Sequence, residues 1–263
     1  MEECQIDLMR GMKFTATSDM IDHNAVVYAY ENGCIDIVAS ERRIFRESGW
    51  ESPKKERKTR AQGVKSEGDD ALRSARRARA KLRRLALANS FDFFVTLTLD
   101  QTKIDRYDAA AIMKKVNGWL DNMVRRNGLR YVLVPEQHKD GAFHFHGFFA
   151  GRSLKVTDSG HKDSCGEAVY NLPQWGYGFS TAIKLRGEYP RAVGYVCKYI
   201  GKQEGQRPMG RWYYSGGALV EPTKLYADLD YTELSNNSDS IEFDTPGGKL
   251  LVIHTKMEEN GND

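Results

Sequence analysis

The order of hydrophobic and polar positions predicts a chain that changes several times between helix and strand. Residues 71–88 carry leucine and alanine at spacings of three and four, from Leu72 to Leu85, which is the pattern of an amphipathic helix. In residues 91–100, "FDFFVTLTLD", side chains alternate as in a strand with a buried face. The same two patterns predict a helix over 108–126 that ends at Asn127-Gly128, strands over 130–138, 142–151 and 176–185, a helix over 189–203 with Pro190 in its first turn, and a β-leaning segment from 211 onward.

Turn-forming and polar residues divide the chain between these elements. Two β-rich runs in residues 24–40 flank Asn32-Gly33, a sequence typical of a tight hairpin turn. Residues 41–70 are polar and poorly periodic, which indicates a linker or an arm that orders on binding, and residues 151–168 indicate a Gly/Ser-rich loop. We therefore divide the chain into a β-hairpin element (1–40), a basic linker with an Arg-rich helix (41–90), a main domain (91–215) and a β-leaning extension with a frayed tail (216–263).

The order strand, helix, hairpin, strand, helix in the main domain is typical of the α+β class. We expect an antiparallel sheet flanked by helices that cover one of its sides. A ferredoxin-like or RNA-recognition-like core is compatible with this order.

Charge adds a candidate surface for nucleic acid. A chain of 263 residues with 40% hydrophobic residues can bury a core, and its net charge is only +3. Residues 41–90 nevertheless hold 16 Lys and Arg against 7 Asp and Glu, and such asymmetry favours a nucleic-acid contact, although a solvated helix face explains it equally well. The candidates for phosphate contacts lie on the polar face of the helix: Arg73, Arg76, Arg77, Arg83 and Arg84.

The cysteines and the apolar runs favour a soluble protein of the cytoplasm. The four cysteines form no C-x-x-C pair, so neither a zinc ribbon nor a redox motif is indicated. No apolar run approaches the roughly 18 residues of a membrane span, and the N-terminal residues lack a secretory pattern. A G-x-x-x-x-G-K-[ST] phosphate-binding loop is also absent from the sequence.

The stretch "PEQHKDGAFHFHGFF", residues 135–149, holds candidate metal ligands. His144 and His146 alternate on one strand, so both imidazoles point from the same face. A two-residue turn before them would place Glu136 on the opposite face, whereas a three-residue loop with a glycine or bulge position would place it beside them. A metal site therefore predicts the three-residue loop. Such a site suits Mg²⁺ or Mn²⁺, with Zn²⁺ less suitable, and His138 is either an alternative to Glu136 or an edge residue.

The stretch "GYVCKYIGK", residues 194–202, places two tyrosines on one predicted helix face. Tyr195, Tyr199 and Lys202 lie at i, i+4 and i+7, with Lys198 flanking them. A tyrosine hydroxyl has a pKa of about 10, so a nucleophilic tyrosine needs a nearby cation or a metal-polarised electrophile. Without such a role, the same pattern describes a helix that buries its aromatic side chains and exposes its lysines.

The order "FVTLTLD", "EQHKDGAFHFHGFF", "YVCKYIGK" resembles the three motifs of the HUH endonuclease superfamily, specifically the rolling-circle replication initiators (Rep proteins) of small phages and plasmids. The resemblance spans about residues 91–202, and the last motif is similar to the Y-x-x-K-Y-x-x-K pattern of two-tyrosine initiators. Relaxases place the tyrosine before the histidine pair, so the motif order argues against them.

This resemblance implies a function for each candidate residue. It implies an HUH core in which His144, His146 and Glu136 bind the metal, Tyr199 is the nucleophile, Tyr195 is the second nucleophile and Lys202 and Lys198 assist. The product would be a 5′-phosphotyrosine and a 3′-hydroxyl that primes replication. The implied partners are single-stranded DNA or an origin hairpin and a host helicase and polymerase in the bacterial cytoplasm, with no membrane. Trp175, Tyr177 and Trp212 are weaker candidates for stacking on bases.

Three other functions remain compatible with parts of the pattern. A single-strand transposase of the same superfamily would share the metal site and the tyrosine. A non-catalytic origin-binding regulator would use the basic helix without needing Tyr199, and a metal-dependent phosphohydrolase would need neither the tyrosine pair nor the basic helix.

Overall fold

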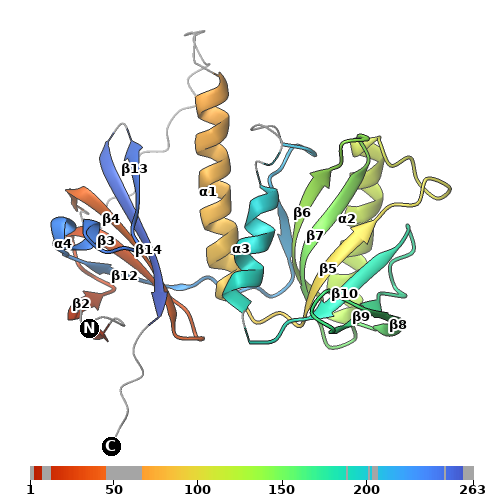
Figure 1. The fold of residues 1–263 in the computed structure, drawn as a ribbon, viewed down its shortest axis with the longest axis horizontal. Helices are drawn as coiled ribbons and strands as arrows, with labels where there is room; N and C mark the ends of the chain where they lie inside the picture. The colour runs from red at the N-terminus through yellow and green to blue at the C-terminus, as the bar shows by residue number, and fades with distance from the viewer. Residues whose placement is uncertain are drawn as a thin grey trace, which may run out of the picture. The chain divides into compact units, whose positions relative to one another are not determined.

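The computed structural model describes residues 3–7, 13–45, 67–187, 189–200, 202, 207–245 and 247–256. The chain divides into two compact units, each built around its own antiparallel sheet (Figure 1). The two-segment unit comprises Met1–Gly63 and Pro222–Asp263, and the central unit comprises Val64–Glu221. Both contain strands and helices, so the expected α+β class is confirmed.

The two-segment unit joins the beginning and the end of the chain in one sheet. Its hairpin strands β3 and β4 meet at Asn32-Gly33, as the sequence predicts, with Gly33 at a positive φ of 75°. Strand β12 pairs with β3 and strand β14 pairs with β4, so C-terminal strands flank the N-terminal hairpin on both sides. The elements are β1 (Glu3–Asp7), β2 (Lys13–Thr17), β3 (Asp22–Ala29), β4 (Cys34–Phe45), β12 (Thr223–Ala227), α4 (Tyr231–Ser235), β13 (Ile241–Thr245) and β14 (Gly248–Lys256), in the sheet order β1-β2-β12-β3-β4-β14-β13.

The central unit holds all the candidate site residues. Its sheet has the order β11-β6-β7-β5-β10-β9-β8, and all of its pairs are antiparallel. The elements are α1 (Glu67–Leu87), β5 (Phe93–Thr98), α2 (Ala109–Asn127), β6 (Arg130–Gln137), β7 (Phe143–Ala150), β8 (Thr157–Lys162), β9 (Ala168–Asn171), β10 (Ser180–Lys184), α3 (Tyr189–Tyr199) and β11 (Tyr214–Gly216).

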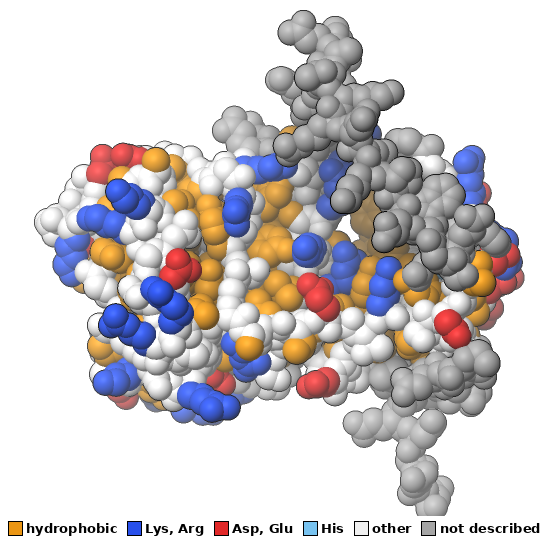
Figure 2. All heavy atoms as spheres, turned by 180° about the vertical axis from the view of Figure 1, so that it is seen from behind, with side chains coloured by type: hydrophobic (Ala, Val, Ile, Leu, Met, Phe, Trp, Pro, Cys, Tyr) orange, Lys and Arg blue, Asp and Glu red, His pale blue; other side chains and the backbone are white. Residues whose placement is uncertain are grey.

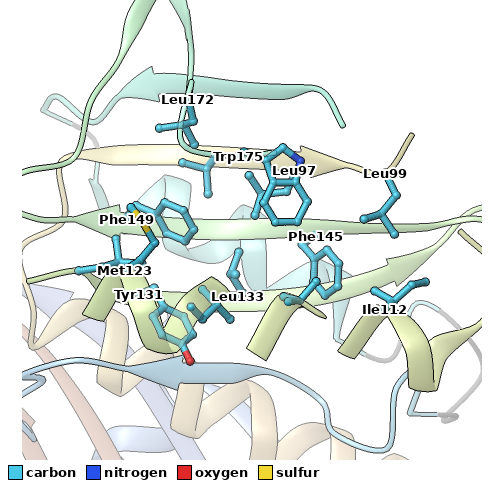
Figure 3. Packing of buried hydrophobic residues seen from close by; sticks show 14 of the residues in the cluster. Leu97, Leu99, Ile112, Met123, Tyr131, Leu133, Phe145, Phe149, Leu172 and Trp175 are labelled. Carbon is cyan, nitrogen blue, oxygen red and sulfur yellow. The ribbon is translucent and has the colours of Figure 1, made fainter. Parts of the chain in front are cut away.

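Alternation along the central strands separates an apolar face from a polar face. Leu97 of β5, Leu133 of β6 and Phe145 of β7 are buried in one cluster with the apolar side of α2, including Ile112 and Met123 (Figure 3). Side chains one position away point to the other face, because successive residues of a strand point in opposite directions. That second face carries the candidate metal ligands.

Helices cover both faces of this sheet, whereas the sequence analysis expected them on one. Helix α2 packs on the apolar face, while α3 contacts β6 and β7 on the other, and α1 packs against α3 (Figure 1). The apolar stripe of α3, with Val193 and Val196, indicates that the helix is partly buried, but it carries no information about which face of the sheet it covers.

The boundaries of several elements differ from the predicted ones. Helix α2 matches its prediction and ends at Gly128, which adopts the left-handed conformation that stops a helix. The predicted linker over 41–70 is shorter, since β4 continues to Phe45 and α1 begins at Glu67, and residues 46–66 of that prediction lie outside the described residues. The predicted loop over 151–168 contains β8 and the start of β9, whose mostly exposed side chains lack the alternation that would predict strands.

Candidate metal and tyrosine site

The hairpin between β6 and β7 has the loop that a metal site requires. Glu136 pairs with His144, and Gln137 pairs with Phe143, so their numbers sum to an even value. The backbone N–H of His138 donates to the carbonyl of Ala142 at 2.9 Å, which leaves a loop of residues 139–141. Its last residue is a glycine at a positive φ of 86°. The predicted three-residue loop is therefore confirmed, and it places Glu136 on the face of the two histidines.

Glu136, His138 and His146 offer ligand atoms that lie within 4.8 Å of one another. The Nε2 atom of His146 lies 2.8 Å from Oε2 of Glu136, and Nε2 of His138 lies 3.8 Å from the same oxygen. Glu136 and His146 are buried, while His138 is exposed. One carboxylate and two imidazoles form a donor set that divalent metals accept, so these residues fit a metal ion.

His144 lies beside this group and is not one of its three members. Its ring stacks on His138, with 3.8 Å between ring centroids. His144 and His146 point to the same face of the sheet, as the alternation predicts. The choice between His138 and His144 as a ligand beside Glu136 and His146 stays a prediction.

Two threonines of β5 hold the two histidines of β7, and the sequence analysis did not single them out. The Oγ1 atom of Thr96 lies 3.1 Å from Nδ1 of His146, and Oγ1 of Thr98 lies 3.3 Å from Nδ1 of His144. Such hydrogen bonds fix the orientation of an imidazole whose other nitrogen binds metal. The signal in the sequence is that the T-x-T of "FVTLTLD" has the same spacing as H-x-H, so one strand can match the other residue for residue.

Lys202 forms an ion pair with the carboxylate at the centre of the group. Its Nζ lies 2.5 Å from Oε1 of Glu136, and the lysine side chain remains more than half exposed. Burial favours the neutral form of Glu136, but the hydrogen bond from Lys202 and the proximity of His146 outweigh burial and lower the pKa of the carboxyl. Glu136 is therefore an ionised carboxylate near neutral pH, as a metal ligand must be.

Burial keeps both histidines of β7 neutral near pH 7. Desolvation, with smaller contributions from the neighbouring imidazoles, lowers the pKa of His144 to about 4. Desolvation also lowers the pKa of His146, although Glu136 opposes this shift. Neutral imidazole is the form that binds metal, so neither side chain has to lose a proton near pH 7 to act as a ligand.

Helix α3 places Tyr199 directly against this group. The ring of Tyr199 stacks on the ring of His146, with 4.1 Å between centroids and 7° between planes. Its hydroxyl donates a hydrogen bond to the hydroxyl of Tyr195 at 2.8 Å, and Nζ of Lys202 lies 5.3 Å from the centroid of its ring. Tyr195 is 50% exposed, and Lys198 is exposed one residue before Tyr199. The predicted tyrosines, Lys202, Glu136 and His146 therefore meet at one place.

The pKa of the Tyr199 hydroxyl is raised well above its ordinary value. Burial is the main cause, and the hydrogen bond to Tyr195 and the charge of Glu136 add to it. The hydroxyl is therefore protonated at neutral pH. A reaction at its oxygen requires a proton acceptor or a strongly polarised electrophile.

Helix α1 holds α3 near both ends. The hydroxyl of Tyr189, at the start of α3, donates to the carbonyl oxygens of Ala86 and Asn89 at 2.6 and 3.1 Å. Near the other end, Nε of Arg79 donates to the carbonyl of Ile200, the residue after Tyr199, at 2.7 Å. The sequence analysis assigned α1 to DNA, and it did not single out this use of Arg79.

The predicted DNA-binding arginines of α1 differ in exposure. Arg73, Arg76 and Arg77 are exposed, whereas Arg83 and Arg84 are half-buried. Arg73 forms an ion pair with Asp70 at 2.8 Å. On the face of the chain shown in Figure 2, Lys and Arg side chains are spread among other types. Contact between these five arginines and DNA stays a prediction.

Two of the three proposed stacking residues belong to the protein interior, which corrects their assignment. Trp175 is buried in the core, and its Nε1 donates to the carbonyl of Thr98 at 3.1 Å. Trp212 is buried as well, and its Nε1 donates to Oγ of Ser74 at 3.0 Å. Tyr177 is half-buried against the same core as Trp175. Sequence spacing cannot distinguish an aromatic residue that packs from one that stays exposed.

Residues 92–204 match the model of a family described as replication-associated proteins of the ORF2 type. All three motifs considered above lie inside this range, which is less than half of the chain. The match supports a relation to replication initiators and to DNA as a partner. No curated protein and no solved structure shows significant similarity to the chain. Among the described residues, none of the helices combines the length and the apolar character needed to cross a membrane.

Proposed function

We propose that this protein is a rolling-circle replication initiator of the HUH superfamily, of the two-tyrosine type, which nicks single-stranded origin DNA through Tyr199. The observation that carries the proposal is the stacking of Tyr199 on His146, a member of the metal-compatible group. The match of residues 92–204 to a replication-associated family supports the same function.

The proposed nicking step exchanges one phosphate ester for another. The oxygen of Tyr199 attacks the scissile phosphorus, the bond from phosphorus to the 3′ oxygen breaks, and a 5′-phosphotyrosine forms. The proton of Tyr199 leaves through the hydroxyl of Tyr195, which accepts its hydrogen bond, and the departing 3′ oxygen gains a proton and becomes the primer hydroxyl. Atoms and charge balance without an oxidant or a nucleotide cofactor.

The polar residues around Tyr199 have separate functions in this proposal. Glu136 and His146, with His144 or His138, would hold Mg²⁺ or Mn²⁺, and a bound ion supplies charge stabilisation at the scissile phosphate. Thr96 and Thr98 orient the two imidazoles of β7. Lys202 and Lys198 provide positive charge for the phosphate oxygens.

The second tyrosine allows the strand to be rejoined. Tyr195 would cleave the regenerated origin after one round, and the freed 3′-hydroxyl would attack the first phosphotyrosine to close a circle. Its hydroxyl lies 2.8 Å from that of Tyr199, so both act on phosphates at the same place. The implied setting is the cytoplasm of a bacterial host, with a host helicase and polymerase as partners.

A covalent-adduct assay tests the nicking step. A labelled single-stranded origin oligonucleotide is incubated with the protein and Mn²⁺ and separated on a denaturing gel, with Tyr199→Phe, His146→Ala and the control Tyr170→Phe run in parallel. We expect an adduct with wild type and Tyr170→Phe, and a loss of at least about 10³-fold with the other two variants. Chelation of the metal should also abolish it. Binding of the oligonucleotide without an adduct under any metal would contradict the proposal and favour a non-catalytic origin-binding regulator.

A further inference from the structure

Phe179, the residue before β10, has the most exposed side chain of the large hydrophobic residues that the structure describes. It is 75% exposed, whereas nearby Trp175 is buried in the core. A single exposed phenylalanine is ordinary on a protein surface, so its position decides whether it has a function.

Phe179 lies in the cross-strand row of the candidate metal ligands. The backbone N–H of Thr98 donates to the carbonyl of Phe179 at 2.8 Å, Thr98 pairs with His144, and His144 pairs with Glu136. Residues that face each other across antiparallel strands point to the same side of the sheet. Phe179 therefore points to the face of the metal group, at a distance of about 10 Å from His144, which is two strand spacings.

The backbone around Phe179 is held firmly against β5. A Cβ atom added to Gly178 would lie 2.1 Å from the carbonyl oxygen of Thr98, so only glycine allows this close approach. The carbonyl of Tyr177 accepts a hydrogen bond from the N–H of Asp100 at 2.9 Å, and the buried indole of Trp175 donates to Thr98. The exposed ring of Phe179 is thus attached to a fixed stretch of backbone.

The face next to Phe179 continues from the tyrosine site and stays accessible. Helix α3 contacts β6 and β7, and its Tyr195 reaches Phe94 of β5. Toward β10, Thr181 is exposed on the same face, beside the half-buried Thr96. A nucleic-acid strand with a phosphate at Tyr199 can extend from α3 across β5 toward β10.

We infer that Phe179 is a stacking platform for an unpaired base of the DNA strand that enters the tyrosine site, an inference that rests on the proposed function. An aromatic ring fixed beside a phosphate-binding site is the usual means by which proteins hold single strands, because every base has a flat face that can stack. A paired base is already stacked on its neighbours and cannot cover the ring. Phe179 would therefore favour single-stranded over duplex DNA.

Binding without metal tests this inference separately from the nicking chemistry. Fluorescence anisotropy in EDTA measures the affinity for an oligothymidylate of about 20 nucleotides, for the matching duplex and for an abasic strand that has the phosphates without the bases. The variants are Phe179→Ala, Phe179→Trp and the control Val220→Ala, another exposed apolar residue of the central unit.

We expect Phe179→Ala to weaken binding of the oligothymidylate about tenfold, with little change for the duplex or the abasic strand, and Phe179→Trp to retain affinity. Equal affinity of wild type and Phe179→Ala for the oligothymidylate would overturn the inference, as would an equal loss on the abasic strand. If wild type forms no covalent adduct but Phe179→Ala shows the selective loss, the nicking proposal fails while the platform stands. Normal nicking with unchanged binding by Phe179→Ala gives the opposite result.

Discussion

At the scale of single residues, the carboxylate of Glu136 is shared between a metal-compatible group and a lysine. One oxygen lies 2.5 Å from Nζ of Lys202, and the other lies 2.8 Å from Nε2 of His146. A divalent ion bound to Glu136 would meet the positive charge of Lys202 at the same carboxylate. The lysine and the metal therefore compete for this charge.

This competition predicts that Lys202→Met strengthens metal binding while it weakens nicking. Because the lysine side chain is more than half exposed, solvent screens the ion pair, and we expect a gain in Mn²⁺ affinity of at most about fivefold. Titration calorimetry with Mn²⁺ measures the affinity, and Lys184→Met, which removes an exposed lysine of β10, is the control. Weaker Mn²⁺ binding by Lys202→Met would show that the lysine supports the site instead of competing with it.

The sequence predicted some of these residues and could not predict others. Glu136 could be placed beside the histidines because side-chain direction alternates along a strand, so loop length alone decides the face. The distance from His138 to Glu136 depends on how the hairpin end folds back, which spacing does not reveal. Phe179 was missed because Trp175, Tyr177 and Phe179 have the same parity along the chain, and only the start of β10 separates packed rings from an exposed one.

At the scale of secondary-structure elements, α1 acts as a support for the tyrosine helix. The hydrogen bond from Arg79 to the carbonyl of Ile200 lies next to Tyr199, and the bonds of Tyr189 fix the other end of α3. A small displacement of a nucleophile can lower a rate about a hundredfold. Arg79 is therefore expected to position Tyr199 without touching the substrate.

The prediction is that Arg79→Met lowers kcat for nicking by roughly ten- to a hundredfold and leaves the affinity for single-stranded DNA nearly unchanged. Single-turnover nicking and anisotropy measure the two quantities, with the exposed Lys81→Met of α1 as the charge-matched control. Arg79→Lys, which keeps a donor for the carbonyl, should recover part of the rate. A parallel loss of DNA affinity in Arg79→Met would identify the residue as a phosphate contact and contradict the positioning function.

Elements with strong hydrophobic periodicity were predicted well, and the others were not. Helix α2 has a continuous apolar stripe and a glycine stop, so both its existence and its end follow from the sequence. Strands β8 and β9 form a mostly exposed hairpin, which leaves no apolar pattern to find. The side of the sheet that α3 covers depends on tertiary packing and is absent from local periodicity.

At the scale of the whole molecule, segments from both ends of the sequence complete one sheet. Strands β12 and β14 pair with the two outer edges of the β3–β4 hairpin, and Leu251 and Ile253 of β14 are buried in its core. The sequence indicated β-rich segments at both ends but carried no signal for their pairing, because strand pairing over long separations has no local signature.

This pairing predicts that removal of residues 222–263 destabilises the two-segment unit selectively. Without β12 and β14, both edges of the hairpin lose their hydrogen-bond partners, and the apolar core is exposed. Hydrogen exchange should show fast exchange of amides in β3 and β4, with amides of β6 and β7 as protected as in the full chain. Retained protection in β3 and β4, or equal loss in β6 and β7, would contradict the division into two units.

The central claim is that Tyr199 becomes covalently attached to DNA, and peptide mass spectrometry of the trapped adduct tests it most directly. Wild-type protein is reacted with single-stranded origin DNA and Mn²⁺, digested with nuclease and protease, and searched for a tyrosine that carries a nucleotide 5′-phosphate. The account predicts this modification on the peptide that contains Tyr199, with Tyr195 modified only after a second cleavage. A modified residue outside α3, or efficient nicking with no covalent intermediate, would contradict it.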